Sequence, residues 1–583
     1  MSRLSPGGRS CRGRLLAALF AVTAVVTGCS GVPRSSVPLA VRTLDDAGNP
    51  TPELTVRPEP DDDPRTTVDK FLQANVSKDE QHPTARTFLT DAAAGKWQDR
   101  TVTVVDDYRV GVLDHGVLPV TGRIVGSLDS IGVYTPTLAG AGASQERTFL
   151  FRLTSVNRQW RISEPPRGLL IRRSDFEATY RRRPLYFFDQ QESRLVPDLR
   201  YSAAEQQSLA TWLLTELITG AQPALQATLR NEFPDQLKSE RAKVTLGAPV
   251  VSIQLPGLSQ AEPQIAARVA AQIAYTFYSF QASQPITLLD GPTPVPLGAS
   301  IPANFTRETF ASLSPVPSTT PSLYYVRNGA LVGAASLPVP GPAGTGRYAL
   351  RSVAVTGTEG DLTVAGLASP GTTLFRGPAR GALSPVSLPA PATTRPDFRP
   401  GPSHEVWLGA GPAVLRVIGA KVTRVAVTAV GPAPLGQKLL AVRFSPDGAR
   451  VALVYAAPAN SSVWIGTVGT GDEPVRIESL RQVTPMDWRV TDVAWSDAES
   501  LRAIGSSVTN GDIEIWSFAE DGTAPELHSA ANLPAAPDAV AAGSGVSTVV
   551  SAAATVWREE PGGGWADALP RDKPDGSAPI FAG

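Results

Sequence analysis

The sequence has very little cysteine, methionine, histidine and lysine. Its 583 residues include two Cys, two Met and four His, and only eight of the 53 basic residues are Lys. The sequence predicts cleavage of the first 28 residues, which removes one Cys. The remaining Cys can form neither an intrachain disulfide nor a thiolate metal cluster. The scarcity of Met argues against a Met-lined adaptable binding surface. The dominance of Arg, with abundant Ala, Gly and Pro, is typical of a high-GC bacterial genome.

The sequence also lacks the short motifs of common catalytic sites. It has no H-E-x-x-H or Cys/His pair for zinc, no G-x-S-x-G elbow for a serine nucleophile and no glycine loop for phosphate. The histidines stand in separate segments: His82, His115, His404 and His528. We therefore expect no enzyme and name no catalytic residue, metal ligand or cofactor. Because carboxylates are plentiful, a paired-carboxylate glycosidase site stays open as an alternative.

Length and composition favour a loop-rich, mainly β protein of several domains. Hydrophobic residues make up 42% of the chain, while Gly and Pro supply 51 and 53 residues. A chain this long is expected to split into roughly three or four domains. The net charge is −1, and without the four arginines of the first 28 residues it becomes −5, from 49 basic and 54 acidic residues. That balance argues against nucleic acid as a partner.

The first 28 residues resemble a bacterial signal peptide. Four Arg and no acidic residue accompany an apolar run over residues 15–26. This run is shorter than the roughly 17–25 residues that span a membrane, but it suits the apolar core of a signal. It leads into Val26-Thr27-Gly28-Cys29, which resembles the bacterial lipobox. The alternative is an ordinary signal peptide with an incidental Cys.

A lipobox predicts cleavage between Gly28 and Cys29 and lipid on the new first residue. Cys29 then becomes an S-diacylglyceryl cysteine with an N-palmitoyl group. Two or three acyl chains anchor a protein stably, whereas a single chain holds it only marginally. We therefore expect a lipid-anchored protein on the extracytoplasmic face of the cell membrane.

Changes in composition divide the chain into a signal peptide, a Pro-rich acidic linker, two α/β-type domains and a long β region. The corresponding ranges are 1–28, 29–63, 64–182, 183–300 and 318–583. The linker ends in Asp61-Asp62-Asp63, which we interpret as solvated because no EF-hand spacing follows. Arg181-Arg182-Arg183 is interpreted as a solvated connection. The alternative is an anionic docking patch for lipid headgroups or teichoic-type polymers.

Residues 64–182 predict helices followed by a curved antiparallel sheet. Strand-like runs cover 101–105, 108–113, 117–128, 147–153 and 159–162, and the turn Asn157-Arg158 makes the last two a hairpin. This order is that of an NTF2-like or cystatin-like cone.

Residues 183–300 predict strands alternating with two helices. Ser202-x-x-Glu205 and Ser259-x-x-Glu262 are interpreted as capping boxes, and Gly220 as the end of the first helix. The series resembles the GerMN domain of bacterial envelope and sporulation proteins, over residues 185–196, 212–220 and 274–291.

The region from 318 onward repeats strands with almost no helix. Five equivalent positions are separated by 43, 46, 51 and 45 residues, a period typical of propeller blades. These anchor positions are Val355, Phe398, Phe444, Trp495 and Val540. Residues 323–332 begin a further copy, so we expect about six blades.

Several side chains of this β region are predicted to be structural. Asp447, Asp497 and Asp512 stand in turns, where Asp usually bonds to the backbone. Trp464, Trp495 and Trp516 are expected to pack between blades, and Trp565 is expected to be exposed.

Lipobox, α+β cone, GerMN-like domain and propeller, in this order, resemble the actinobacterial LpqB lipoprotein family. The resemblance implies association with a two-component system through the extracytoplasmic domain of an MtrB-like sensor kinase. It further implies roles in cell-envelope homeostasis, division and development. The leading hypothesis is a membrane-anchored binding protein that modulates this kinase, with cell-wall glycan as a further partner. The alternative is an envelope glycan-acting enzyme, or a glycan- or solute-binding lipoprotein.

Overall fold

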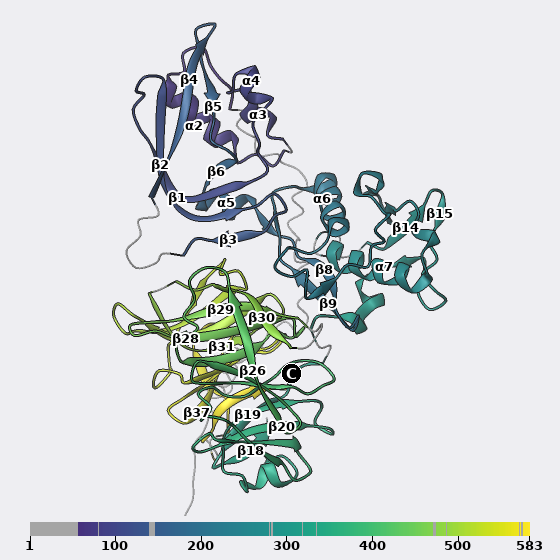
Figure 1. The fold of residues 1–583 in the computed structure, drawn as a ribbon, viewed down its shortest axis with the longest axis vertical. Coiled ribbons are helices and arrows are strands. Elements are labelled where there is room, and N and C mark those ends of the chain that lie inside the picture. The colour runs from purple at the N-terminus through teal and green to yellow at the C-terminus, as the bar shows by residue number, and fades with distance from the viewer. Residues whose placement is uncertain are drawn as a thin grey trace, which may run out of the picture. The chain divides into compact units, whose positions relative to one another are not determined.

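The computed structural model describes residues 56–582 apart from 80, 139–145, 279, 281–283, 317–318, 334, 470–473, 486, 571 and 573–574. Residues 56–583 form one compact unit. The predicted signal peptide and the lipobox residues Val26, Thr27, Gly28 and Cys29 lie outside the described residues. The expected fold class is confirmed, because strands dominate and the helices gather in the first two domains (Figure 1).

The N-terminal domain, from 64 to 179, places helices before and after a mixed sheet (Figure 1). Its sheet has the order β5-β4-β2-β1-β6, with β3 beside β2, and only the β1–β6 pair is parallel. The helices are α2 (Pro64–Ala74), α3 (Pro83–Arg86), α4 (Asp91–Ala94) and α5 (Arg173–Thr179). The strands are β1 (Val102–Val110), β2 (Val117–Leu128), β3 (Tyr134–Pro136), β4 (Glu146–Val156), β5 (Gln159–Glu164) and β6 (Leu169–Arg172).

Helix α2 begins within the predicted solvated linker. The Asp63 side chain accepts a hydrogen bond from the Thr66 backbone N–H at 2.7 Å, and Asp62 pairs with Lys70 at 2.7 Å. The interpretation as solvated was therefore wrong for Asp62, whose side chain is 8% exposed, whereas Asp63 caps the helix and stays exposed. An N-terminal carboxylate satisfies helix N–H groups that have no partner within the helix. Val68 and Phe71 then bury the other face of α2.

Two strand predictions in this domain have different outcomes. Strands β4 and β5 form the expected hairpin, and both turn residues, Asn157 and Arg158, have positive φ. The runs predicted as two strands, 101–105 and 108–113, are instead one strand, β1. Its register against β2 shifts between Val105 and Tyr108, as in a β-bulge. A local irregularity in the pattern therefore bends the strand without ending it.

The middle domain, from 185 to 313, packs two long helices against short strands. Strand β8 lies between β11 and β9, and a second sheet has the order β12-β13-β14-β15 with β16 beside β14. The strands are β8 (Leu185–Asp189), β9 (Leu195–Asp198), β10 (Tyr201–Ser202), β11 (Leu229–Arg230), β12 (Lys243–Thr245), β13 (Val251–Gln254), β14 (Ile286–Asp290), β15 (Thr293–Pro294) and β16 (Asn304–Phe305). The helices are α6 (Gln206–Thr219), α7 (Pro263–Tyr278) and the short 3₁₀ helices η1 (Ser239–Arg241), η2 (Leu258–Gln260) and η3 (Arg307–Leu313).

Both predicted capping boxes in this domain are wrong. Ser202 belongs to strand β10, and α6 begins after Glu205 without a side-chain cap. Ser259 lies in η2 and hydrogen-bonds to Asp290, so α7 begins only at Pro263. Gly220 does stand at the C-terminal cap of α6, with a φ of 110°. The expected apolar faces of the two helices are buried as well.

The predicted solvated connection is partly a strand. Arg181 and Arg182 form β7 (Arg181–Arg182), which pairs antiparallel with Tyr201 and Ser202 of β10. Both arginine side chains are exposed, whereas Arg183 is half-buried. The backbone ladder fixes this segment, so the solvated connection is ordered: the side chains of Arg181 and Arg182 are solvated as expected, and that of Arg183 only in part.

The propeller, from 323 to 581, has six blades around one axis. The innermost strands form a closed ring in which each strand contacts the next. In order they are β39 (Ser577–Phe581), β19 (Leu350–Thr356), β23 (Asp397–Phe398), β27 (Leu439–Phe444), β31 (Trp488–Trp495) and β35 (Ala539–Ala541). The last strand β39 pairs with β17, the first strand of the propeller, so the two ends of the propeller sequence complete one blade. This closure confirms the expected number of blades.

The outer strands of each blade follow its innermost strand in the sequence, except in the blade that β39 completes. They are β17 (Leu323–Arg327), β18 (Ala330–Gly333), β20 (Thr363–Ala368), β21 (Thr373–Pro378), β22 (Ser384–Ser387), β24 (Val406–Ala410), β25 (Ala413–Ile418), β26 (Lys421–Ala429), β28 (Arg450–Ala456), β29 (Ser461–Val468), β30 (Arg476–Gln482), β32 (Ser500–Ser507), β33 (Ile513–Ala519), β34 (Glu526–His528), β36 (Val549–Ala552), β37 (Thr555–Glu559) and β38 (Trp565–Asp567). A 3₁₀ helix, η4 (Pro342–Thr345), follows β18.

The repeat anchors occupy equivalent places in the propeller. Each of the five lies near the carboxyl end of a different innermost strand, and each is buried. One expectation failed, since Trp565 is 3% exposed and its indole N–H donates to the Ser529 carbonyl at 2.9 Å. Its position near the C-terminus predicted exposure, but the tryptophan packs in the cluster with Ile515 and Val550.

Candidate binding cleft

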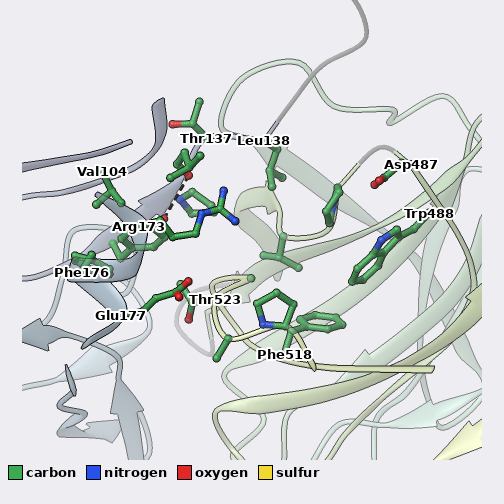
Figure 2. A pocket seen from close by; sticks show the side chains of 18 of the residues that line it. Val104, Thr137, Leu138, Arg173, Phe176, Glu177, Asp487, Trp488, Phe518 and Thr523 are labelled. Atoms are coloured by element: carbon green, nitrogen blue, oxygen red, sulfur yellow. Dashed lines mark hydrogen bonds between the residues drawn. The ribbon is translucent and has the colours of Figure 1, made fainter. Parts of the chain in front are cut away.

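A cleft of about 1160 Å³ lies in the described part of the chain (Figure 2). One wall comes from the N-terminal domain with β7 and β10, and the other from loops and strands of the propeller. Figure 2 shows Arg173, Phe176 and Glu177 on one side and Trp488 and Phe518 on the other. A cleft of this size lies slightly above the ~300–1,000 Å³ range of small-molecule pockets.

Stacked aromatic side chains form the N-terminal wall of the cleft. Phe176 stacks on Tyr180 with ring centroids 4.7 Å apart and on Tyr134 at 5.3 Å. Burial raises the pKa of Tyr134 to about 12 and also raises the pKa values of Tyr180 and Tyr201. These hydroxyl groups are therefore neutral at physiological pH. The wall offers flat apolar surface with fixed polar tips.

The hydroxyl of Tyr201 joins the two walls. It donates to the Asp521 carboxylate at 2.9 Å and lies 2.6 Å from the Thr523 hydroxyl. On the propeller side, Trp488 stacks on Trp516 with centroids 4.4 Å apart and contacts Phe518 edge-on at 6.3 Å. The aromatic side chains are thus held by neighbours on both sides of the cleft.

Arginine is the main charged residue of the lining. Four arginines line the cleft against two carboxylates: Arg123, Arg173, Arg181 and Arg182, with Glu177 and Asp487. Asp106, behind the wall, pairs with both Arg123 and Arg173. Arg181 donates to the Glu177 carbonyl at 2.9 Å, and Arg182 makes no ion pair with any described residue. The cleft therefore favours a ligand that carries negative charge.

A second group of charges holds the middle domain against the propeller. Arg450 lies 2.5 Å from the Glu520 carboxylate and 3.4 Å from Asp447, and it donates to the Pro197 carbonyl of the middle domain. The side chains of Arg450 and Glu520 are each 3% exposed. Tyr186 adds a hydrogen bond to Glu499 at 3.4 Å. The sequence contains no motif that singles out Arg450, because its partners come from distant segments.

Asp447 also has the turn role that the sequence predicts. Its carboxylate accepts hydrogen bonds from the Ser445 hydroxyl at 2.6 Å and the Ala449 backbone N–H at 2.9 Å. Asp497 accepts from the Glu499 backbone N–H at 2.7 Å, whereas the Asp512 carboxylate accepts from the side-chain amide of Asn510 in its turn. The structural interpretation of these aspartates is confirmed.

Carboxylates with raised pKa values lie in several places, and two of them, Glu499 and Glu520, lie together beside Arg450. Burial raises the pKa of Asp397 to about 6 and that of Glu216 to about 7. Asp397 lies at the propeller axis, whereas Glu216 belongs to α6. Within the ranges that the structure describes, no group of three or more His, Cys, Asp or Glu is placed to hold a metal ion. Nor does any described helix have the length and apolar character required to cross a bilayer.

Family models match each of the three domains. A model of the lipoprotein LpqB N-terminal domain matches residues 57–177, and one of the lipoprotein LpqB beta-propeller domain matches 326–582. A sporulation and spore germination model matches 184–293. A lipoprotein LpqB of Mycolicibacterium smegmatis (strain ATCC 700084 / mc(2)155) is 30% identical over 474 residues, covering 76% of this chain and 78% of the relative. The chain belongs to the lipoprotein LpqB family.

Another LpqB relative extends the match to nearly the whole chain. The protein of Rhodococcus opacus (strain B4) is 29% identical over 614 residues, covering 96% of this chain and 98% of the relative. The family carries the name of a lipoprotein and not of an enzyme. Among solved structures, TolB from Acinetobacter baumannii is 12% identical with a TM-score of 0.33, covering 58% of this chain and 82% of its own. That likeness is too weak to carry an argument.

Proposed function

We propose that this LpqB lipoprotein is anchored through Cys29 to the extracytoplasmic face of the cell membrane. There it binds and modulates the extracytoplasmic domain of an MtrB-like sensor kinase, in envelope homeostasis, division and development. Membership of a lipoprotein family and the lipobox-like sequence before Cys29 support the anchor. Confinement to the membrane raises the effective concentration near a membrane partner, so even a modest intrinsic affinity suffices.

The observation that carries the binding role is the composition of the cleft. Arginine and aromatic side chains, which supply ten of its 26 lining residues, are enriched in protein interfaces and in their energetic hot spots. Its volume of about 1160 Å³ exceeds that of most small-molecule pockets. A protein segment with acidic side chains matches both the size and the charge. Cell-wall glycan is a weaker match, because binding an uncharged glycan does not require the four arginines of the lining.

The test is affinity capture of the anchored protein from crosslinked cells. Arg181→Glu/Arg182→Glu reverses two exposed charges of the cleft and keeps the β7–β10 backbone ladder. We expect recovery of the kinase to fall at least about tenfold, which corresponds to roughly 1.4 kcal/mol. The matched control is Arg167→Glu/Arg424→Glu, which reverses two exposed arginines outside the cleft lining.

Three results would count against the proposal. Equal loss with the control pair would mean that net charge, and not the cleft, controls binding. Full kinase signalling by a soluble Cys29→Ala protein at native abundance would contradict the tethering argument. Recovery of wall polymer in place of the kinase would favour the glycan-binding or glycan-acting alternative.

A further inference from the structure

The propeller has a small cavity on its axis. It lies at the carboxyl ends of the innermost strands, all six of which contribute to its lining, and it has a volume of about 130 Å³. The volume is close to that of an engineered apolar cavity of about 150 Å³ that binds benzene. The space therefore fits one group of the size of an aromatic ring.

The wall of this axial cavity is apolar and largely aromatic. Four of the repeat anchors that line it are 2–6% exposed: Val355, Phe398, Phe444 and Trp495. The indole N–H of Trp495 is already bonded to the Arg443 carbonyl at 3.1 Å. Flat faces from several blades favour a ring as the occupant, because rings pack offset or edge-on against one another.

Charged side chains lie beside the apolar wall. Arg443 and Asp397 line the cavity, and Arg395 and Asp492 stand behind them. Asp492 pairs with Arg395 and lies 3.2 Å from Arg443, and it accepts the Val540 backbone N–H at 3.1 Å. Two arginines and two aspartates give no net charge. The group therefore provides no general attraction for an anion or a cation.

Two polar atoms of these charged side chains have no hydrogen-bond partner among the described residues. The buried Nε–H of Arg443 donates to no described residue. Asp397 accepts the Phe444 backbone N–H through Oδ2 at 2.8 Å, and its other oxygen accepts no hydrogen bond from the described residues. Buried polar groups are almost always paired, so this donor beside the cavity requires a partner, which is either a ligand atom or an ordered water.

We propose that the axial cavity binds a phenol. The ring occupies the apolar wall, and the hydroxyl accepts from the Nε–H of Arg443 and donates to Asp397. A hydroxyl combines both roles without charge, whereas a carboxylate would face Asp397 and an ammonium would face Arg443 and Arg395. A purely apolar ring would leave the Arg443 donor unpaired. The phenol is either a free small molecule or the tyrosine side chain of a peptide segment.

The experiment compares three ring compounds by isothermal titration calorimetry. The protein is the full mature chain with Cys29→Ala, which is free of lipid that would absorb apolar compounds. We expect p-cresol to bind at least tenfold more tightly than toluene, which lacks the hydroxyl, and than p-toluate, which carries a charge. Equal affinity for toluene or for p-toluate would overturn the assignment of the hydroxyl, and absence of saturable p-cresol binding would overturn the site.

Variants locate the binding. Asp397→Asn keeps an oxygen for the Phe444 N–H but weakens the acceptor, so p-cresol affinity should fall at least tenfold. The matched control is Asp538→Asn, on the blade of β35, whose carboxylate bonds to Ser551 away from the cavity. If Asp397→Asn does not fold, Val355→Phe, from another blade, should exclude p-cresol by filling the space. Unchanged p-cresol affinity in a folded variant of either kind would overturn the proposal.

A blocked Gly-Tyr-Gly peptide separates the two sources of phenol. Displacement of p-cresol by this peptide, and not by blocked Gly-Phe-Gly, supports a tyrosine side chain as the occupant. Failure of the peptide while p-cresol binds supports a free phenol.

Discussion

The middle domain and the propeller have interiors of different kinds. One continuous apolar cluster fills the middle domain, with Leu213, Ile253 and Phe277 among its fully buried members. The apolar side chains of the propeller fall into six smaller clusters, with charged side chains buried at the axis and beside the middle domain. Because the blades pack face to face, the polar ends of their innermost strands lie at the propeller axis. Buried ion pairs therefore complete the propeller, whereas in the middle domain one continuous apolar core accounts for most of the interior and a single fully buried pair, Arg200–Asp198, lies beside it.

The largest effect is expected where the two interiors meet. Arg450→Met removes the cation between Glu520 and Asp447 and leaves their carboxylates unpaired in a buried site. We expect a loss of about 3–5 kcal/mol in the free energy of unfolding, measured by urea titration. Adding Glu520→Gln to this variant should recover part of the lost free energy of unfolding. Arg424→Met, an exposed position, is the control, and an equal loss there would refute the distinction.

An apolar deletion in the middle domain should cost slightly less. Leu213 is fully buried in the single cluster, so Leu213→Ala removes packed methyl groups and leaves a cavity. We expect a loss of about 3 kcal/mol in the free energy of unfolding by urea titration. Leu527→Ala, at a residue that is 55% exposed, should change it by less than about 0.5 kcal/mol. Similar values for both variants would mean that the cluster does not behave as one core.

Glu216 belongs to a small charged group within the middle domain, beside the buried pair Arg200–Asp198. Burial raises its pKa from 4.5 to about 7, and Arg200, 3.8 Å away, offsets only part of that effect. Between pH 4.5 and 7 the folded state holds a proton that the unfolded state has lost, so stability falls as the pH rises through this window. Glu216→Gln should flatten this slope and raise stability at pH 7 by about 1–2 kcal/mol, with allowance for solvent screening. Urea titrations at pH 5 and 7.5 measure the change, and an unaltered slope would contradict it.

The smallest effect is expected far from both interiors. Asp63→Ala removes the N-cap of α2 and should lower the unfolding free energy of the N-terminal domain by about 1 kcal/mol. Thermal melting with Asp61→Ala as the exposed control measures it. A loss as large as that of Arg450→Met would mean that burial in the two interiors does not determine how much a residue contributes to the free energy of unfolding.

Much of the architecture could be predicted because it repeats locally. Each blade is one supersecondary unit, so its alternating strand and its anchor, such as Phe444 or Trp495, recur along the sequence. The turn role of Asp447 was also predictable, since its partners Ser445 and Ala449 lie within two residues. The lipobox-like sequence ending at Cys29 is a local signal of the same kind, and it stays a prediction.

The errors came from residues whose partners are distant in the sequence. Ser202 has the spacing of a helix cap, but pairing with Arg181 in β7 draws it into a strand. Trp565 lies near the C-terminus, but the adjacent blade buries it. In both cases a tertiary contact outweighed a local preference, because capping and turn preferences amount to only about 1 kcal/mol.

The sequence by itself determined the number and kind of the domains, because hydrophobic alternation and turn residues specify strands and blades locally. Only the tertiary structure decided which charges are buried together. Arg450 meets Pro197, and Arg395 meets Asp492, across separations of 253 and 97 residues. No periodic pattern encodes such pairs. Closure of the ring of innermost strands and docking of the middle domain exclude water from these contacts. Without water, each buried charge is stable only beside its partner, so the contacts favour one arrangement of the domains.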